Sequence, residues 1–302
     1  MPFKVIIMLL GKLYDQYKNA IKLEELKGNI EVAAIGDIAP YARSLDGWRL
    51  CTTEEALSSG FDYLIMSQGV RETENAALTF SKIGIDPERV LSIEIFGAQC
   101  FDFPGYVRLH HSKLSIIAKN CWGGFTYHAL RLKFRSPFIN MFLDDDDFLR
   151  FLASPAEYLS LPLTEYDKTR PGAVQADYPL AGLGDLLLHL NHYKSFEDGK
   201  RCWEERKARI NPDGLFMMAF TTSPQIAESY GKLPYGRKVI FTPEEFGVEG
   251  ELCLKDYNAW LSEDRSDFWK NVNGVANGTL QYYDPIKLLN GDPDFLRIEK
   301  NG

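Results

Sequence analysis

Apolar runs alternate with segments of helical spacing over the first hundred residues. Residues 3–11 and 30–35 have the continuous apolar pattern of buried strands, and residues 14–26 between them have helical spacing. A strand, a helix and a strand follow over 61–67, 72–84 and 89–95. This alternation predicts a parallel sheet covered by helices. Residues 1–108 are therefore expected to form an N-terminal α/β domain that ends in a connector bearing Pro104 and Gly105.

The opening strand, helix and strand are arranged as at the start of a dinucleotide-binding domain, where an acidic residue after the second strand holds a ribose. Asp37 stands at that position. The glycine fingerprint is missing, because Gly11 stands alone in Met-Leu-Leu-Gly-Lys. No residue is then assigned to the close approach of a pyrophosphate. The pattern favours a Rossmann-like domain without a bound dinucleotide, and the sequence assigns no cofactor.

The most informative pattern spans residues 114–143. An apolar strand-type run ends at the polar pair Lys119-Asn120, and Gly123-Gly124 opens a helix-type segment. Ser136-Pro137 ends this helix, and a second apolar run, 138–143, is expected to form another strand. A strand, a glycine corner and a helix present free backbone N–H groups at the helix start, and such groups attract anions.

Four consecutive aspartates, 144–147, follow this unit. On an extended backbone Asp144 and Asp146 would share one face, as in the metal and diphosphate sites of some nucleotide-sugar transferases. A run with helical spacing, 148–152, begins directly after them. Because carboxylates before a helix cap it and favour its dipole, the sequence favours the capping role, and no metal ligand is assigned.

Strand and helix patterns alternate again in the second half of the chain. An apolar run over 185–191 is expected to be a strand of a parallel sheet that ends at His192-Tyr193-Lys194. Ser195 and Asp198 then open a helix that runs through Arg209. Two more strands, with a helix between them that begins at a serine cap and a proline, are expected over 215–220 and 238–241.

Together these patterns predict the α/β fold class, with two Rossmann-like parallel-sheet α/β domains and a short mixed C-terminal extension. Residues 109–302 form the second domain and carry the candidate site. Its extension, 250–302, loses the periodicity and holds aromatic residues such as Trp260 among charges. We expect short helices there.

Composition narrows the classes of function. The chain has 302 residues and a net charge of −8, which argues against nucleic acid as a partner because nucleic-acid binding needs a basic face. The first apolar run, 5–10, is too short to span a membrane and lacks a signal-peptide cleavage region. We therefore expect no membrane span and a cytoplasmic location. The five cysteines are widely spread, which fits neither a disulfide framework nor a zinc site.

Asn120, Gly123 and Gly124 are the candidate anion seat. A diglycine permits positive φ and brings backbone N–H groups close to a ligand, although a tight turn that needs glycine only for its geometry explains the pair equally well. Ser136 and Asn140 are candidate polar contacts at the same crevice, and a turn role for Ser136 and a cap or cross-strand role for Asn140 are the alternatives. His128, about one turn into the helix, is either a general base or a partly buried structural histidine.

His192 is the leading catalytic candidate, because open α/β sheets bind ligands at the carboxyl ends of their strands. A purely structural His192 is the open alternative. Lys194, at the same strand end, is a candidate anion contact. Arg206 and Arg209 are spaced to clamp a phosphate or carboxylate, although a solvated helix with Glu–Arg pairs is the favoured explanation. His189 and His192 point to opposite faces of a strand, which weakens a shared metal site.

Five of these motifs, in this order, resemble an uncharacterised bacterial family found among capsule and exopolysaccharide biosynthesis proteins. They are Asn-Cys-Trp-Gly-Gly at 120–124, Ser-Pro-Phe-Ile-Asn at 136–140, His-Tyr-Lys at 192–194, Trp-Glu-Glu-Arg at 203–206 and Lys-Val-Ile-Phe-Thr at 238–242. The resemblance spans about residues 112–245. The N-terminal part is similar to the Rossmann-like segment attached to polysaccharide-locus enzymes, with its glycine corner degraded to Met8-Leu9-Leu10-Gly11.

Two functions follow. The anion-suited corner, with basic and histidine residues at one predicted sheet edge, favours a transferase that takes an activated donor such as a nucleotide sugar, an anionic small molecule. The resemblance implies that its pathway is surface-polysaccharide biosynthesis. Gly123-Gly124, Lys194 and Arg206 would then hold the phosphates of the donor, and His192 or His128 would act as the base. An acyl or phosphoryl transferase is a lesser variant. The alternative is a non-catalytic module that binds a sugar nucleotide or a partner enzyme. The motifs of the commonest hydrolases, NTPases and metalloproteases do not occur.

Overall fold

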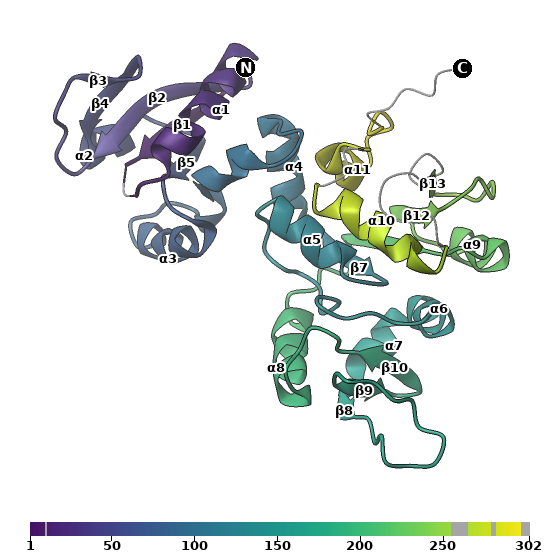
Figure 1. Cartoon of the computed structure of the whole chain (residues 1–302). Coiled ribbons are helices and arrows are strands. Elements are labelled where there is room, and N and C mark those ends of the chain that lie inside the picture. Colours follow the sequence, from purple (N-terminus) through teal and green to yellow (C-terminus); the bar gives the residue numbers. More distant parts are fainter. Residues whose placement is uncertain (10, 255–264, 279–281, 297–302) are drawn as a thin grey trace. The chain divides into compact units, whose positions relative to one another are not determined.

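The computed structural model describes residues 1–9, 11–254, 265–278 and 282–296 (Figure 1). The chain divides into two compact units, one of residues 1–111 and 285–290 and the other of residues 112–284 and 291–302. The sequence placed this division after residue 108 and kept the whole extension with the second domain, whereas helix α11 (Pro285–Asn290) groups with the first unit. The expectation for Trp260 lies outside the described residues. Both units contain sheets of parallel strands with helices, which confirms the predicted α/β class.

The first unit is built on a six-stranded sheet of order β3-β4-β2-β1-β5-β6. All neighbouring strands are parallel except β3 and β4, which are antiparallel. Residues Val5 to Met8 of β1 are completely buried, as their continuous apolar run predicts. The strands are β1 (Phe3–Met8), β2 (Ile30–Asp37), β3 (Ser44–Leu45), β4 (Trp48–Thr52), β5 (Tyr63–Met66) and β6 (Val90–Ser92), and the helices are α1 (Tyr14–Leu26), α2 (Thr53–Ser58), α3 (Val70–Ser81) and α4 (Phe103–Ser112).

In the first unit, hydrogen bonds within the chain occupy the edge of the sheet where a dinucleotide would bind. Strand order reverses between β1 and β5, and in open α/β sheets this is where a dinucleotide binds. There the backbone N–H of Gly11 donates to the Ser67 hydroxyl over 3.1 Å, and a Cβ on Gly11 would lie 2.3 Å from the Ser67 carbonyl oxygen. At the start of α3 the Glu94 carboxylate accepts from the backbone N–H of Val70. The lone glycine therefore allows the loop to approach β5, and a carboxylate of the chain itself accepts a backbone N–H at the start of α3.

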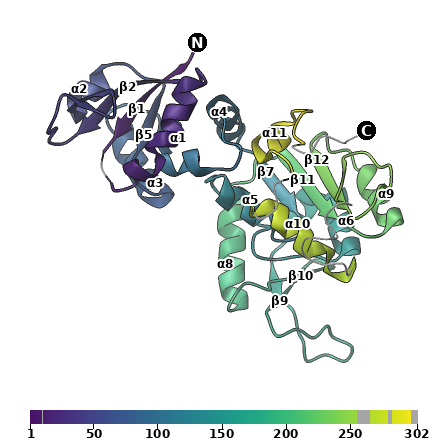
Figure 2. The ribbon, with the colours of Figure 1, turned by 45° about the horizontal axis from the view of Figure 1, so that its top comes forward.

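The second unit contains a four-stranded sheet of order β13-β12-β11-β7, in which every pair is parallel (Figure 2). The strands are β7 (Ser115–Ala118), β11 (Leu215–Phe220), β12 (Lys238–Thr242) and β13 (Glu251–Cys253), and the helices that follow them or pack nearby are α5 (Trp122–Ala129), α9 (Pro224–Gly231) and α10 (Phe268–Ala276). Because α5 follows β7 and α9 follows β11, both helices begin at the carboxyl edge of this sheet.

An insertion separates α5 from β11. It holds α6 (Asp145–Ala153), α7 (Pro155–Ser160), α8 (Phe196–Lys207) and a small sheet of order β10-β9-β8, built from Leu186–His189, Leu180–Leu183 and Thr164–Glu165. The prediction that 185–191 forms a strand of a parallel sheet is wrong, because β10 pairs antiparallel with β9. Gly184, at a φ of 63°, and Asp185 make the short turn between them. So short a connection can join only antiparallel strands.

The second predicted strand of the central unit, 138–143, is absent. This segment forms only an isolated bridge between Phe142 and His189, so its apolar run serves the core instead of a sheet. Phe138 lies at the centre of an aromatic cluster, 4.6 Å from the ring centroid of Phe151 and 5.4 Å from that of Trp203. All three side chains are completely buried. Their packing fixes α6 and α8 against the four-stranded sheet, which sets the position of the first residues of α6.

Candidate functional site

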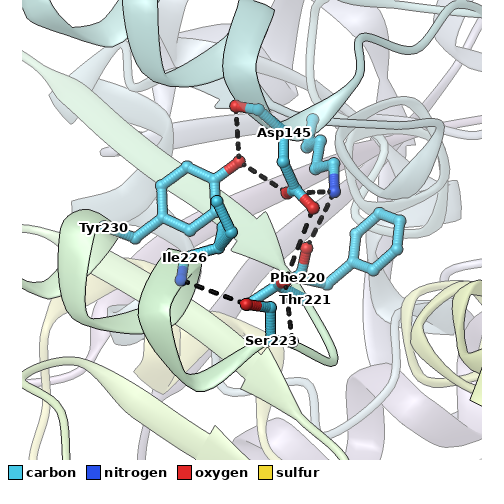
Figure 3. Close-up of polar contacts among 7 residues, drawn as sticks. Asp145, Phe220, Thr221, Ser223, Ile226 and Tyr230 are labelled. Carbon is cyan, nitrogen blue, oxygen red and sulfur yellow. Dashed lines mark hydrogen bonds and ion pairs between the residues drawn. The ribbon is translucent and has the colours of Figure 1, made fainter.

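A group of polar residues lies at the carboxyl ends of β7 and β11 (Figure 3). Lys119 directly follows β7, Thr221 directly follows β11, and Asp145 is the first residue of α6. Open α/β sheets place ligands at this edge. We call Lys119, Asp145, Thr221 and Tyr230 the edge cluster.

Lys119 is a buried cation that is held by Asp145. Lys119 is only 6% exposed, and the strand that precedes it is fully buried. The ammonium donates to the Asp145 carboxylate and to the Phe220 carbonyl oxygen at 3.0 Å, and it lies 4.3 Å from the centroid of the Phe220 ring. Burial lowers the pKa of Lys119, and the Asp145 carboxylate opposes this shift.

Asp145 is the accessible member of the edge cluster, with 31% of its side chain exposed. The Tyr230 hydroxyl donates to its Oδ1 at 3.0 Å, and the Thr221 hydroxyl donates to its Oδ2 at a long 3.5 Å. Burial raises the pKa of Tyr230, so this hydroxyl stays a donor. Oδ1 is thus committed to two donors, while Oδ2 retains capacity to accept a hydrogen bond from a substrate.

His189 forms a second cluster beside the first, and the sequence weighed it only as a metal ligand. It is 7% exposed and stacks on Phe142 with ring centroids 4.3 Å apart. Its Nδ1 lies 3.2 Å from the Tyr178 hydroxyl, and its Nε2 lies 3.9 Å from Oδ2 of Asp144, the residue before Asp145. Nε2 is buried and makes no hydrogen bond within the described part of the chain.

Replacing His189 with glutamine is expected to make the protein less sensitive to acid. Burial lowers the pKa of His189, and Asp144 and Asp147 oppose the shift only in part. Below about pH 6.5 the unfolded chain therefore binds a proton that the folded protein takes up only at lower pH, so the folded state loses stability. Thermal unfolding followed from about pH 7.5 down to about pH 5 should show the larger fall for the wild type. Equal falls for the two proteins would contradict this assignment.

The glycines of the predicted anion seat have a packing role. Gly123 and Gly124 lie inside the first turn of α5, are buried, and do not have positive φ. The prediction of a corner opened by positive φ is therefore wrong. A Cβ on Gly123 would lie 3.0 Å from Cβ of Ala118, and one on Gly124 would lie 3.3 Å from Cγ2 of Ile139. The absence of side chains lets α5 lie close to β7 and to the segment that follows the helix.

The three predicted polar contacts of the anion seat, Asn120, Ser136 and Asn140, lie in different environments. Asn120 is buried, accepts from the backbone N–H of Trp122 at 3.1 Å and donates to Asn273 of α10 at 3.1 Å. The Ser136 hydroxyl is completely buried and accepts from the backbone N–H of Phe138, which is the turn role given as the alternative. Asn140 is exposed, with a φ of 61°. Only Asn120 lies beside the edge cluster in the chain.

The two predicted catalytic histidines are exposed, His128 in the last turn of α5 and His192 in the turn after β10. Because β10 belongs to the antiparallel sheet, neither His192 nor the exposed Lys194 stands at a carboxyl edge of parallel strands, and that part of the prediction is wrong. Within the described residues, no hydrogen bond or ion pair joins either histidine side chain to the edge cluster.

The predicted arginine clamp is split. Arg206 donates to the Tyr193 hydroxyl at 2.6 Å and lies 5.2 Å from the ring of Phe134. Arg209 lies beyond the end of α8 and donates to the Glu205 carbonyl oxygen, so the two no longer share one helix face. Among the residues that the structure describes, no polar contact joins Arg206 to Asn120. The convergence of these side chains on one pocket stays a prediction.

Sequence reasoning missed the edge cluster because each member had an ordinary explanation. From the sequence alone, Lys119 is explained as part of a polar corner after a strand, and Asp145 as one of several aspartates that cap a helix. In the structure Asp144 is the N-cap residue of α6 but makes no side-chain capping hydrogen bond, and Asp145 turns to Lys119 instead. The available signal was a lysine placed directly after the apolar run Ile116–Ala118, where a buried ammonium requires a counter-charge.

Three absences hold for residues 1–9, 11–254, 265–278 and 282–296. No helix in these ranges is both long enough and apolar enough to cross a membrane. No three histidine, cysteine, aspartate or glutamate side chains in them group in a way that could hold a metal ion. None of the five cysteines forms a disulfide, and two of them, Cys51 and Cys121, are buried.

Comparison with known proteins places the chain beside a family of unknown function and an uncharacterised relative. The family model described as "Domain of unknown function (DUF1919)" matches residues 93–290. A Haemophilus influenzae protein described as "Uncharacterized protein" is 34% identical over 143 residues, which cover 46% of this chain. The match spans 66% of that protein, slightly less than two thirds of its length. Neither description states a ligand or a reaction, so the function must be argued from the residues.

Proposed function

The chain belongs to the DUF1919 family, and on that premise we propose that it is a transferase of bacterial surface-polysaccharide biosynthesis that uses a nucleotide-sugar-like donor. One observation carries the proposal: a partly exposed carboxylate, Asp145, is held beside a buried lysine, Lys119, at the carboxyl edge of a parallel sheet. The resemblance of five separate motifs to polysaccharide-locus proteins supports the choice of pathway. We place the enzyme in the cytoplasm, with an anionic small molecule and not nucleic acid as its ligand.

In this proposal Asp145 is the general base. Its Oδ2 accepts the proton of the acceptor hydroxyl while the acceptor oxygen bonds to the anomeric carbon of the donor. The bond from that carbon to the diphosphate breaks, and its electron pair leaves with the nucleoside diphosphate. Lys119 has a positioning role, because its ammonium holds the Asp145 carboxylate in place and its charge offsets a carboxylate that would otherwise repel the donor.

Titration calorimetry with a panel of nucleotide sugars tests this arrangement. We expect the wild type to bind one member of the panel. Lys119→Met should weaken that binding at least about tenfold, because it leaves an uncompensated carboxylate beside the diphosphate. Lys200→Met, which removes an exposed lysine of α8, is the matched control and should bind like the wild type. No binding across the panel, or equal binding by both variants, would contradict the proposal.

A non-catalytic binding module is the second candidate, and one observation favours it. The Lys119–Asp145 pair satisfies itself without a ligand, as a purely structural buried ion pair does. The module predicts donor binding without turnover. Release of nucleoside diphosphate from the bound donor by the wild type distinguishes the enzyme from the module.

A further inference from the structure

A pocket of about 650 Å³ lies in the insertion of the second unit. One wall is the loop between β8 and β9, residues 166–179, and the other is the segment 194–197 that leads into α8. Figure 1 shows this loop extending from β8 and β9. We call the cavity the loop pocket. Neither the edge cluster nor any residue of the anion seat lines it.

The loop that forms the pocket is held in shape by its own contacts. The Lys168 ammonium donates to the carbonyl oxygens of Ala176 at 2.8 Å and Tyr178 at 2.6 Å, which ties the two arms of the loop together. The backbone N–H of Val174 donates to the Tyr166 hydroxyl at 3.1 Å. A pocket that exists before its ligand arrives costs less ordering entropy on binding.

The lining is rich in hydrogen-bond acceptors. Within the described residues, the carboxylates of Glu165, Asp177 and Glu197 make no hydrogen bond or ion pair, and neither does the Lys194 ammonium. Carboxylates disfavour a phosphate or another anion, and charged walls disfavour an apolar ligand. A ligand with many hydroxyl groups satisfies both features, because its hydroxyls donate to the carboxylates and accept from the lysine.

One wall of the pocket is tied to the proposed reaction centre. Tyr178 lines the loop pocket, and its hydroxyl lies 3.2 Å from His189 Nδ1. On the other side of the ring, Nε2 faces Asp144 Oδ2 at 3.9 Å. With a proton on Nε2, directed at this carboxylate, Nδ1 accepts from the Tyr178 hydroxyl. The tyrosine oxygen then keeps its own lone pairs for a ligand in the pocket, and the buried Nε2 has a function.

We propose that the loop pocket binds a neutral, hydroxyl-rich sugar, held by Asp177, Glu197 and a Tyr178 hydroxyl that the His189–Asp144 pair orients. That this sugar is the acceptor of the transfer rests on the proposed function, whereas sugar binding itself does not. Asp144 directly precedes the proposed base, so the pocket and Asp145 are connected through His189 and one step along the chain.

Saturation-transfer NMR with glucose, galactose and N-acetylglucosamine measures binding to the pocket. We expect at least one of these sugars to bind the wild type, and Asp177→Ala and Glu197→Ala each to weaken it about tenfold, as expected for the loss of a hydrogen bond to a charged group. Asp213→Ala, which removes an exposed aspartate from the turn before β11, is the matched control and should bind normally. Absence of binding by all three sugars, or equal binding by all variants, would overturn the proposal.

The binding of spermidine, a polycation, distinguishes a sugar site from a cation site. Binding of a neutral sugar should be unaffected by added salt, because no net charge is screened. Tighter binding of spermidine than of any sugar, weakened by salt, would show that the carboxylates form a cation site and would refute the proposal. The sugar titrations contain no donor, so failure of the wild type to bind any nucleotide sugar would contradict only the proposed function.

The tautomer of His189 provides a readout that is independent of any ligand. Nitrogen-15 NMR of the imidazole near neutral pH should show the proton on Nε2 and a free lone pair on Nδ1. Tyr178→Phe should shift the Nδ1 resonance and weaken sugar binding, while the protein remains folded because the ring that packs against Phe142 is kept. A proton on Nδ1, donated to the tyrosine oxygen, would contradict the proposed orientation of Tyr178.

Discussion

Asp145→Asn is expected to lower the free energy of unfolding by about 2–3 kcal/mol. The substitution leaves the buried Lys119 ammonium without a counter-charge, and a buried charge that loses its partner costs more than the pair itself contributes. The value lies at or below the lower limit of the roughly 3–5 kcal/mol for breaking a fully buried pair, because 31% of the Asp145 side chain is exposed to solvent. Urea unfolding followed by circular dichroism measures the change.

The double variant Lys119→Met/Asp145→Asn is the control for this result. Removing both charges removes the desolvation cost of the lysine as well as the attraction, so the double variant should recover at least half of the lost stability. Asp146→Asn, which changes an exposed neighbour in the same run, should leave stability within about 0.5 kcal/mol of the wild type. A double variant less stable than Asp145→Asn would show that the pair does not act as a compensated buried charge.

The same double variant is expected to bind the donor and to turn it over about a hundredfold more slowly or worse, because removing a general base costs roughly 10²–10⁴ in rate. Its edge cluster is electrically neutral, as in the wild type, so the diphosphate meets no added repulsion. What it lacks is the carboxylate that accepts the acceptor proton. Release of nucleoside diphosphate, with water as the acceptor, measures the rate in both proteins.

Asp146→Asn is again the matched control and should turn over donor at the wild-type rate. If the double variant binds donor and releases diphosphate as fast as the wild type, Asp145 is not the general base. Loss of donor binding by the double variant would instead mean that the charged pair itself contacts the donor.

The fold class could be predicted from the sequence, because burial determines which positions along the chain are apolar. The runs at Val5–Met8 and Ile116–Ala118 are apolar at every position, which is the signature of strands covered on both faces. Helix starts followed as well, because Ser195 and Ser223 carry the capping hydroxyls that the structure uses. Local signals of this kind need no knowledge of distant contacts.

The antiparallel insertion did not follow, because the direction of a strand is not contained in its apolar pattern. The run that ends at His189 is equally compatible with either sheet, and only the turn at Gly184 decides between them. The apolar segment around Phe138 read as a strand because aromatic core packing and strand burial give the same short pattern.

The edge cluster escaped prediction for a different reason. Lys119 and Asp145 are 26 residues apart, and Thr221 is 76 residues beyond Asp145, so no spacing rule connects them. Their contact depends on how the aromatic core seats α6 over β11. The glycine pair was noticed for its composition, but only the close contact with Ala118 shows that packing requires it.

The most direct test of the account is a crystal structure of the Lys119→Met/Asp145→Asn variant soaked with the nucleotide sugar that the panel identifies. We predict that the anomeric carbon of the donor lies within about 5 Å of the side chain at position 145, with the diphosphate at the carboxyl ends of β7 and β11. A donor bound anywhere else in the protein would contradict it.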